Sequence, residues 1–226
     1  RGVLFRNAHC PSPLCNPSRT AILIGKAPSA SGIYRNSHWW RPNYPGIVSL
    51  PMHLKANGYT TAGAGKVFHH PPGFNPPDQW DEYFTMVFDD PWDRENCDWV
   101  VDQAVPSWHP MNSLSPYYHE HDWGPMAKPD SEWGDVQAVE WAESFLRRRH
   151  DKPFFLAVGT FRPHIPWYAP PRFFDRYTLD NVRTPAVFDS DLEMLPETGL
   201  RMAEYSRNEF EKMVDGDQWE AAGQAY

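Results

Sequence analysis

The sequence contains no run of apolar residues long enough to cross a lipid bilayer, which takes about 18 or more consecutive apolar residues. The first ten residues also lack the apolar stretch of a signal peptide. We therefore expect the chain as it stands to be soluble, with no membrane among its partners.

Cysteine is also scarce, because Cys10, Cys15 and Cys97 are the three in 226 residues. No C-x-x-C or H-x-x-x-H spacing accompanies them. The pattern therefore predicts neither a disulfide framework nor a zinc site, and the count alone identifies no cellular compartment.

Clustered positive charge is missing as well, apart from the three arginines at 147–149. With a formal net charge of -8, the long-range field of the chain repels nucleic acid, which we do not expect as a partner. An anionic small molecule stays compatible with this charge, because a few cationic side chains that converge in a pocket decide its binding.

The hydrophobic content of 41% and the aromatic content of 15% are enough to build the core of one domain, or of a large part of one. The sequence does not begin with methionine, and the apolar residues 3–5 resemble a strand inside a domain. We therefore expect residues 1–226 to be a partial domain, truncated at both ends.

Helix signals alternate with apolar runs of strand length. Residues 20–25 are typical of the first turns of a helix, and Ser49 is a candidate N-cap for a helix over 50–57. Residues 59–64 and 154–158 are predicted to be buried strands. The clearest helix is predicted over 133–149, opened by Asp130 or Ser131, and its apolar stripe contains Val136, Val139, Ala142, Phe145 and Leu146.

This alternation predicts an α/β fold, with a mostly parallel sheet covered by helices on both faces. Ligands of such sheets collect at the loops that leave the carboxyl ends of the strands. Lys66 and His69 follow one predicted strand, and His164 follows the other. Residues 71–130 lack periodicity and are interpreted as a long insertion or lid, whereas 193–226 are polar, with the start of a helix at 219–226.

Residues 15–19 read Cys-Asn-Pro-Ser-Arg and lead into the predicted helix. A cysteine before a helix N-terminus, next to an arginine, lies where an anion and a developing negative charge are stabilised. A single cysteine in such a loop is more often a small core residue. The whole pentapeptide is what makes Cys15 and Arg19 candidates for a site.

Two further motifs follow along the chain. Residues 65–69 read Gly-Lys-Val-Phe-His, and residues 161–166 read Phe-Arg-Pro-His-Ile-Pro. Histidine suits proton transfer, because its unperturbed pKa is about 6.5. The plainer interpretations are a solvated surface charge for Lys66 and a packing role between prolines for His164.

These motifs, in this order, resemble those of the sulfatase family. Residues 15–19 match the signature C-x-P-S-R, with Gly25 where the signature ends, and the two later motifs match Gly-Lys-x-x-His and Pro-His-x-Pro. Where the family usually has Leu-Thr-Gly-Arg, residues 23–26 read Leu-Ile-Gly-Lys. The sequences of these motifs most resemble those of the iduronate-2-sulfatase type and its bacterial relatives.

The resemblance implies an alkaline-phosphatase-like α/β domain that hydrolyses sulfate esters. It implies that a separate maturing enzyme oxidises Cys15 to formylglycine, whose hydrate is activated by Arg19 and a divalent metal, commonly Ca²⁺, and attacks sulfur. Lys66 and His69 would bind the sulfate, and His164 would assist the leaving group. Cys15, as formylglycine, would be the metal ligand in this chain, with the others outside it, so the fragment alone is expected to be inactive.

The resemblance also implies a sulfated small molecule or glycan as substrate, and an exported protein, whether periplasmic, secreted or lysosomal. The sequence contains eleven tryptophans, whose rings could stack on a sugar, notably at 39–40 and 167–168. Most tryptophans are expected in the core, and Trp167 alone is expected to form a wall of the pocket.

Two alternatives stay open. One is a phosphoesterase of the same superfamily, which would use serine or threonine in place of Cys15. The other is a non-catalytic, truncated sulfatase fold that only binds a sulfated glycan.

Overall fold

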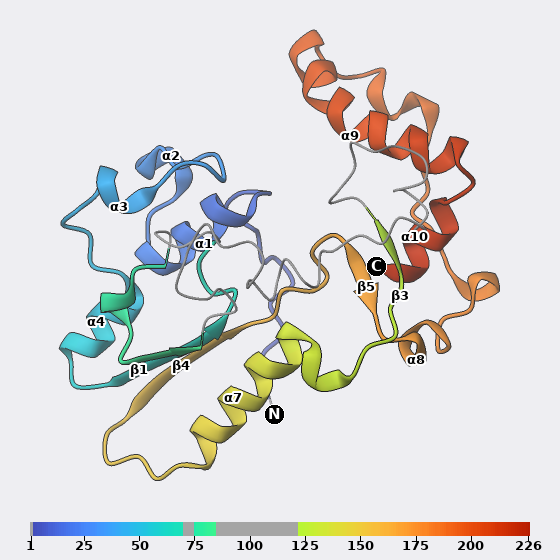
Figure 1. Ribbon diagram of the computed structural model, residues 1–226. Helices are drawn as coiled ribbons and strands as arrows, with labels where there is room; N and C mark the ends of the chain where they lie inside the picture. The colour runs from blue at the N-terminus through green and yellow to red at the C-terminus, as the bar shows by residue number, and fades with distance from the viewer. Residues whose placement is uncertain (1, 70–74, 85–121) are drawn as a thin grey trace. The chain divides into compact units, whose positions relative to one another are not determined.

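The computed structural model describes residues 2–69, 75–84 and 122–226 (Figure 1). The chain divides into two compact units. The first unit contains the described residues of Arg1–Trp99 together with Gly134–Phe161, and the second contains those of Val100–Trp133 together with Arg162–Tyr226. Each unit has a hydrophobic cluster of its own, so each is described by itself, and the expectation of one partial catalytic domain stays a prediction.

Helix α1 (Cys15–Ile24) contains the turns that the sequence predicts over 20–25, but it begins earlier. It starts at Cys15 because Pro17, which has no N–H, is tolerated in the first turn of a helix. The helix ends at Gly25, whose φ of 69° lies in the left-handed region that favours glycine.

Helix α4 (Leu50–Ala56) confirms the second predicted helix. Its N-cap is Ser49, whose side chain accepts a hydrogen bond from the Met52 N–H at 3.4 Å, and Pro51 lies in the first turn. The cap satisfies one of the amide groups that a helix N-terminus leaves without a partner inside the helix.

The first unit is built on a three-stranded sheet in which all strands are parallel. Strand β1 (Thr60–Gly65) lies between β2 (Glu82–Phe84) and β4 (Phe154–Gly159). Figure 1 shows helix α7 (Gly134–Arg147) on one face of this sheet and α1 and α4 on the other. The predicted α/β fold, with a parallel sheet between helices, is confirmed.

Three sequence-based expectations in this unit need correction. Helix α7 begins at Gly134, and a short 3-10 turn, η3 (Asp130–Glu132), takes the place of the predicted cap. Val139 and Leu146 are exposed, at 42% and 55%, because the buried stripe runs one position away from them. This stripe consists of Gly134, Ala138, Ala142 and Phe145.

The third correction concerns strands that the sequence predicts to be buried. Residues 3–5 form no strand and are 77–85% exposed, since none of the described strands pairs with them and supplies their backbone hydrogen bonds. In β4, Phe154 and Val158 are 38% and 41% exposed, because β4 lies at an edge of the sheet formed by the described residues. The run 154–158 is thus a strand, as predicted, but only a half-buried one.

Part of the segment that the sequence suggests is an insertion belongs to the main sheet. Strand β2 pairs with β1, with Ala62 opposite Glu82 and Ala64 opposite Phe84. Just before β2, the 3-10 turn η1 (Pro77–Gln79) buries Gln79 completely. The rest of 71–130 up to residue 121 lies outside the described residues, except for 75–84.

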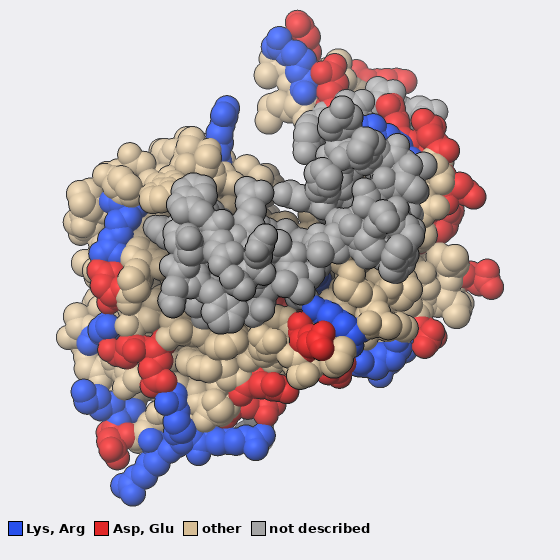
Figure 2. Space-filling view, viewed as in Figure 1, with Lys and Arg blue, Asp and Glu red and all other residues tan. Residues whose placement is uncertain are grey.

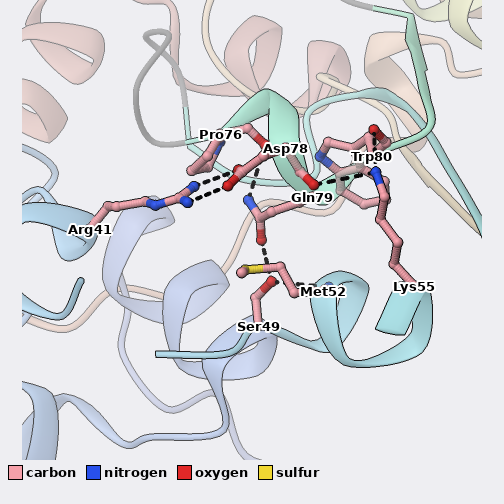
Figure 3. A network of polar contacts seen from close by, with 8 residues as sticks. All are labelled: Arg41, Ser49, Met52, Lys55, Pro76, Asp78, Gln79 and Trp80. Atoms are coloured by element: carbon pink, nitrogen blue, oxygen red, sulfur yellow. Dashed lines mark hydrogen bonds and ion pairs between the residues drawn. The ribbon is translucent and has the colours of Figure 1, made fainter. Parts of the chain in front are cut away.

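A network of polar contacts joins η1 to helices α3 (Trp40–Asn43) and α4 (Figure 3). The Arg41 guanidinium donates two hydrogen bonds to the Asp78 carboxylate, one of them at 2.6 Å. Gln79 accepts a hydrogen bond from the Ser49 hydroxyl, and the Lys55 ammonium donates to the Trp80 carbonyl at 3.1 Å. These contacts fix the chain that leads into β2.

The second unit contains a two-stranded parallel sheet and several helices. Strands β3 (Trp123–Pro125) and β5 (Trp167–Ala169) pair, and Trp123, Met213 and Ala222 form the buried cluster. The helices and 3-10 turns that follow β5 are α8 (Pro171–Phe174), η4 (Leu179–Asn181), η5 (Asp189–Leu192), α9 (Glu197–Asp215) and α10 (Trp219–Ala225). The helix predicted at 219–226 is confirmed.

Helix α9 (Glu197–Asp215) was not predicted from the sequence. Its residues are mostly polar, and acidic side chains outnumber basic ones on the surface over α9 and α10 (Figure 2). The low average hydropathy of this stretch hides an amphipathic pattern, and the helix packs against α10.

Candidate functional site

Cys15 is the first residue of α1, and its side chain is half-buried. Leu14 precedes it in extended conformation, and no side chain caps the helix. The first amide groups of a helix carry partial positive charge and bind anions. Cys15 therefore lies at the end of α1 where a negatively charged group is stabilised, and its role in a site stays a prediction.

Asn16 is fully buried and fixes the start of α1 to the loop that follows α2 (Pro28–Ser31). Its side-chain amide donates to the carbonyls of Arg35 at 3.0 Å and His38 at 2.8 Å. Its backbone N–H donates to the side chain of Asn36 at 3.0 Å, and its Oδ1 accepts from the Thr20 hydroxyl at 2.9 Å. The side-chain amide N–H groups thereby hold the neighbouring loop, and the side-chain oxygen is used within α1.

Lys66 is a buried cation that approaches Cys15. Its side chain is only 2% exposed, and its Nζ lies 4.0 Å from the Cys15 Sγ. The same ammonium lies 4.5 Å from the centre of the Phe161 ring, within the range of a cation–π interaction. This burial contradicts the plainer interpretation of Lys66 as a solvated surface charge.

The backbone around Lys66 is fixed by a close approach of two strand ends. The Lys66 N–H donates to the Gly159 carbonyl at 2.7 Å, where β1 and β4 end side by side. A Cβ on Gly65, whose φ is 69°, would lie 2.1 Å from the Gly159 oxygen, which is far inside contact distance. Only glycine therefore fits there, and Lys66 leaves the strand in one fixed direction.

Arg19 lies one turn of α1 after Cys15 and reaches the same segment. Its guanidinium donates to the carbonyl of Lys66 and, at 3.2 Å, to that of Val67. Burial lowers the pKa of Arg19, and attraction to Cys15 and Tyr83 opposes this shift. Arg19 thus holds the chain after β1 against α1, which the sequence reading did not foresee.

Tyr83 of β2 supports the same turn from the other side. Its hydroxyl donates to the Gly65 carbonyl at 2.5 Å, and burial raises the pKa of this phenol above its usual value. The sequence reading also missed Asn16, Tyr83 and Phe161. Asn16 could have been recognised as a polar residue inside the cysteine motif. Tyr83 gave no such signal, because it lies in the segment interpreted as an insertion.

The remaining predicted residues are placed as follows. His69 is half-buried in the first unit, three residues beyond Lys66. His164 belongs to the second unit, where one of its ring nitrogens, Nδ1, lies 2.6 Å from the Ile165 carbonyl. Trp167 is in the same unit, so the meeting of His164 and Trp167 with Cys15 stays a prediction.

Trp167 packs inside the second unit. Its ring lies 6.2 Å from that of Trp123 and 5.5 Å from that of Tyr226, and its indole N–H donates to the Pro163 carbonyl at 2.8 Å. These contacts give Trp167 a packing role in its own unit.

The described residues are expected to supply few of the ligands of a divalent cation. Among the residues that the structure describes, no group of three or more His, Cys, Asp or Glu side chains could hold a metal ion. Ca²⁺ takes about six to eight oxygen ligands. The described residues therefore do not fit a complete calcium site.

A parallel α/β sheet, with a helix-terminal cysteine beside a buried lysine, defines an α/β protein with a candidate anion site. The family model named Sulfatase matches residues 1–196 of the chain. The chain belongs to the sulfatase family.

Individual relatives agree with this assignment. A sulfatase of Formosa agariphila is 34% identical over 100% of this chain and 45% of its own length. Human iduronate 2-sulfatase is 29% identical over 80% of this chain and 32% of its own, and rat N-acetylgalactosamine-6-sulfatase is 30% identical over 76% and 34%. The expected similarity to iduronate 2-sulfatases and bacterial sulfatases is confirmed, and the chain spans less than half the length of these relatives.

Solved structures with a similar chain path include the phosphonate monoester hydrolase of Agrobacterium radiobacter, with a TM-score of 0.49 and 16% identity over 78% of this chain and 36% of that chain. The PsFucS1 sulfatase from Pseudoalteromonas sp. has a TM-score of 0.42 and 17% identity, over 92% of this chain and 43% of that chain. Within the described ranges, no helix has the length and apolar character needed to span a membrane.

Proposed function

We propose that the protein to which this chain belongs is a sulfuric ester hydrolase in which Cys15 gives rise to the nucleophile. The observation that carries this proposal is the buried ammonium of Lys66, 4.0 Å from the Cys15 Sγ at the N-terminus of α1. Both residues fall within the part of the chain that matches the sulfatase family. A fixed cation and a helix N-terminus both stabilise a sulfate group and the charge that develops on it.

The proposed nucleophile is formylglycine, made from Cys15 by a separate maturing enzyme. The aldehyde adds water to form a diol, and one diol oxygen attacks the sulfur of the substrate. The bond between sulfur and the alcohol oxygen breaks, and the alcohol leaves with a proton. The sulfated diol then expels sulfate and returns to the aldehyde, so that the net reaction consumes one water molecule.

The other residues divide into groups that bind and groups that position. Lys66 neutralises the oxygens of the sulfate, and His69 joins it there. Arg19 positions Lys66, since its guanidinium is hydrogen-bonded to the carbonyls of Lys66 and Val67. His164 protonates the leaving oxygen, an assignment that rests on the resemblance of the motif at 161–166 to the family. Trp167 forms a wall of the pocket, because an indole beside the site can stack on a sugar ring.

A divalent cation, Ca²⁺ in this proposal, belongs to the whole protein and would supply Lewis-acid activation of the nucleophile. Within this chain the formylglycine derived from Cys15 is its proposed ligand, and the remaining ligands come from other parts of the protein. The named relatives act on sulfated iduronate and sulfated N-acetylgalactosamine, so the proposed substrate is a sulfated sugar. We also propose that the protein is exported to the periplasm, the cell exterior or the lysosome.

Replacement of Cys15 tests this function directly. In the full-length protein, Cys15→Ala should abolish hydrolysis of an aryl sulfate and of a sulfated sugar, because no other residue can carry the diol. Assays with the matching phosphate esters separate a sulfatase from a phosphoesterase. Retention of sulfatase activity by Cys15→Ala would overturn the assignment.

Mass spectrometry of the peptide that contains Cys15 separates the catalytic proposal from the non-catalytic alternative. Conversion makes the peptide lighter than its thiol form and lets it react with a hydrazide. A peptide that carries only the thiol, isolated from the native source, would favour a sulfatase fold that binds a sulfated glycan without cleaving it.

A further inference from the structure

A cavity of about 610 Å³ opens on the first unit beside helices α2 and α3. This volume lies within the range of small-molecule sites, about 300–1,000 Å³. The side chains that give it chemical character are Ser31, Ser37, His38, Trp39, Asn43 and Tyr44. None of them is an acid, a lysine or an arginine, and Figure 2 shows that the visible surface over α2 and α3 is largely uncharged.

The two neighbouring tryptophans at this position have opposite environments. Trp40 is fully buried and stacks on Phe68, with 5.7 Å between ring centres and 13° between planes. Trp39 is 46% exposed and lines the cavity. Trp40 is thus a core residue, whereas Trp39 presents a large indole surface to a ligand.

Helix α3 holds Trp39 in place from both ends. Trp40 anchors it to the core, and the paired hydrogen bonds between Arg41 and Asp78 tie it to the turn before β2 (Figure 3). The side-chain amide of Asn43 donates to the Trp39 carbonyl at 2.6 Å. The backbone that carries the indole is therefore fixed before a ligand binds, which lowers the cost of ordering it.

The cavity also has donors and acceptors for hydroxyl groups. The Tyr44 hydroxyl donates to the Ser31 carbonyl at 2.7 Å and joins α3 to α2. The His38 Nδ1 accepts the Tyr34 N–H at 3.2 Å, so a neutral His38 ring carries its proton on Nε2, which is then a donor. With Ser37 and Asn43, the rim offers groups that both donate and accept.

One residue connects this cavity to the candidate nucleophile. Asn16, the neighbour of Cys15, donates hydrogen bonds from its side chain to the carbonyls of Arg35 and His38, and from its backbone N–H to the side-chain oxygen of Asn36. The loop that supplies Ser37 and His38 is therefore fixed directly to the first turn of α1. Cys15 and the residues that line the cavity thus belong to the same unit and are joined through this loop.

We infer that this cavity binds a neutral pyranose ring of the substrate, next to the sulfated ring, with the sugar C–H face on Trp39 and its hydroxyl groups on His38 and Asn43. An exposed indole gives a large, rigid apolar surface, and uncharged donors and acceptors suit hydroxyl groups better than a sulfate or a carboxylate. This inference rests on the proposed function, and it narrows the substrate class to sulfated oligosaccharides.

The test compares two substrates in the full-length protein: a sulfated disaccharide with a neutral second ring, and an aryl sulfate that has no second ring. Trp39→Ala should lower the ratio of kcat/KM for the disaccharide to kcat/KM for the aryl sulfate by about tenfold, mainly through KM. Trp39→Phe should recover most of the ratio, because an aromatic surface is restored. Tyr59→Ala, which removes a 37% exposed aromatic residue that does not line the cavity, is the matched control and should leave both values unchanged.

An unchanged ratio in Trp39→Ala, with either both substrates affected equally or neither affected, would overturn the inference. If the wild-type protein hydrolyses neither substrate, the proposed function fails. A binding experiment then tests separately whether the cavity is a sugar site. Saturation-transfer NMR with the unsulfated disaccharide should then show contact with the wild-type protein and a loss of contact in Trp39→Ala. Equal signals from both proteins, or none from the wild type, would contradict a sugar site.

Discussion

In the first unit, Cys15, Arg19 and Lys66 contact residues that are far away in sequence, whereas in the second unit His164 contacts its own neighbour in the chain. Cys15 and Lys66 are 51 positions apart, and Arg19 is hydrogen-bonded to carbonyls 47 and 48 positions away. His164 contacts the carbonyl of the next residue, Ile165. Contacts between distant residues exist only because the chain folds, so the approach of Lys66 to Cys15 supports the proposed site, whereas the contact of His164 with Ile165 lends it no such support.

Among the residues that surround Cys15, the largest expected effect comes from Lys66. In the full-length protein, Lys66→Ala should lower kcat/KM for an aryl sulfate by about 10²–10³-fold, because a buried, fixed cation beside the developing charge is lost. Lys26→Ala removes an exposed lysine just after α1 and is the matched control, for which we expect a change within about twofold. Equal effects of the two substitutions would mean that the Cys15–Lys66 approach has no part in catalysis.

The second prediction concerns the backbone that orients Lys66. Gly65→Ala should destabilise the protein by about 3 kcal/mol, because the new Cβ meets the Gly159 oxygen at 2.1 Å and the strand ends must separate. Gly25→Ala is a close control, since Gly25 has the same φ of 69° but has nothing within 4 Å of the added Cβ. It should cost only the left-handed backbone strain, about 1 kcal/mol.

Denaturant unfolding of both variants gives the two free energies of unfolding. A difference near zero between Gly65→Ala and Gly25→Ala would show that the strand ends can separate at no cost. In that case the close approach at Gly65 would not be what fixes the direction of Lys66.

The fold of the first unit was largely predictable because its signals are local. The cap at Ser49, the stop at Gly25 and the apolar run at 154–158 each identify an element from a few residues. The strand expected at 3–5 failed for the opposite reason. An apolar run becomes a strand only when another strand pairs with it, and a short sequence window carries no information about that partner.

The site was predictable in its motifs and not in its supporting contacts. The pentapeptide at 15–19 and Lys66 were identified from order and spacing. The roles of Asn16 and Tyr83 depend on which carbonyls the folded chain brings to them, and those carbonyls belong to residues that are 18 or more positions away in sequence. The exposure of Trp39 and the burial of Trp40 likewise depend on how α3 packs, since two adjacent tryptophans look the same in a sequence.

The last prediction tests whether the second unit contributes a residue to the reaction. If His164 protonates the leaving oxygen, His164→Ala should lower kcat/KM for a sulfated sugar by about 10²-fold, because a sugar alkoxide is a poor leaving group. The same substitution should change the aryl sulfate much less, since a phenolate leaves without a proton. Lys66→Ala, by contrast, should affect both substrates alike, because it acts on the sulfate itself. Equal losses for the two substrates in His164→Ala would remove its assignment as the acid and leave His164 as a residue that packs its own loop through Ile165.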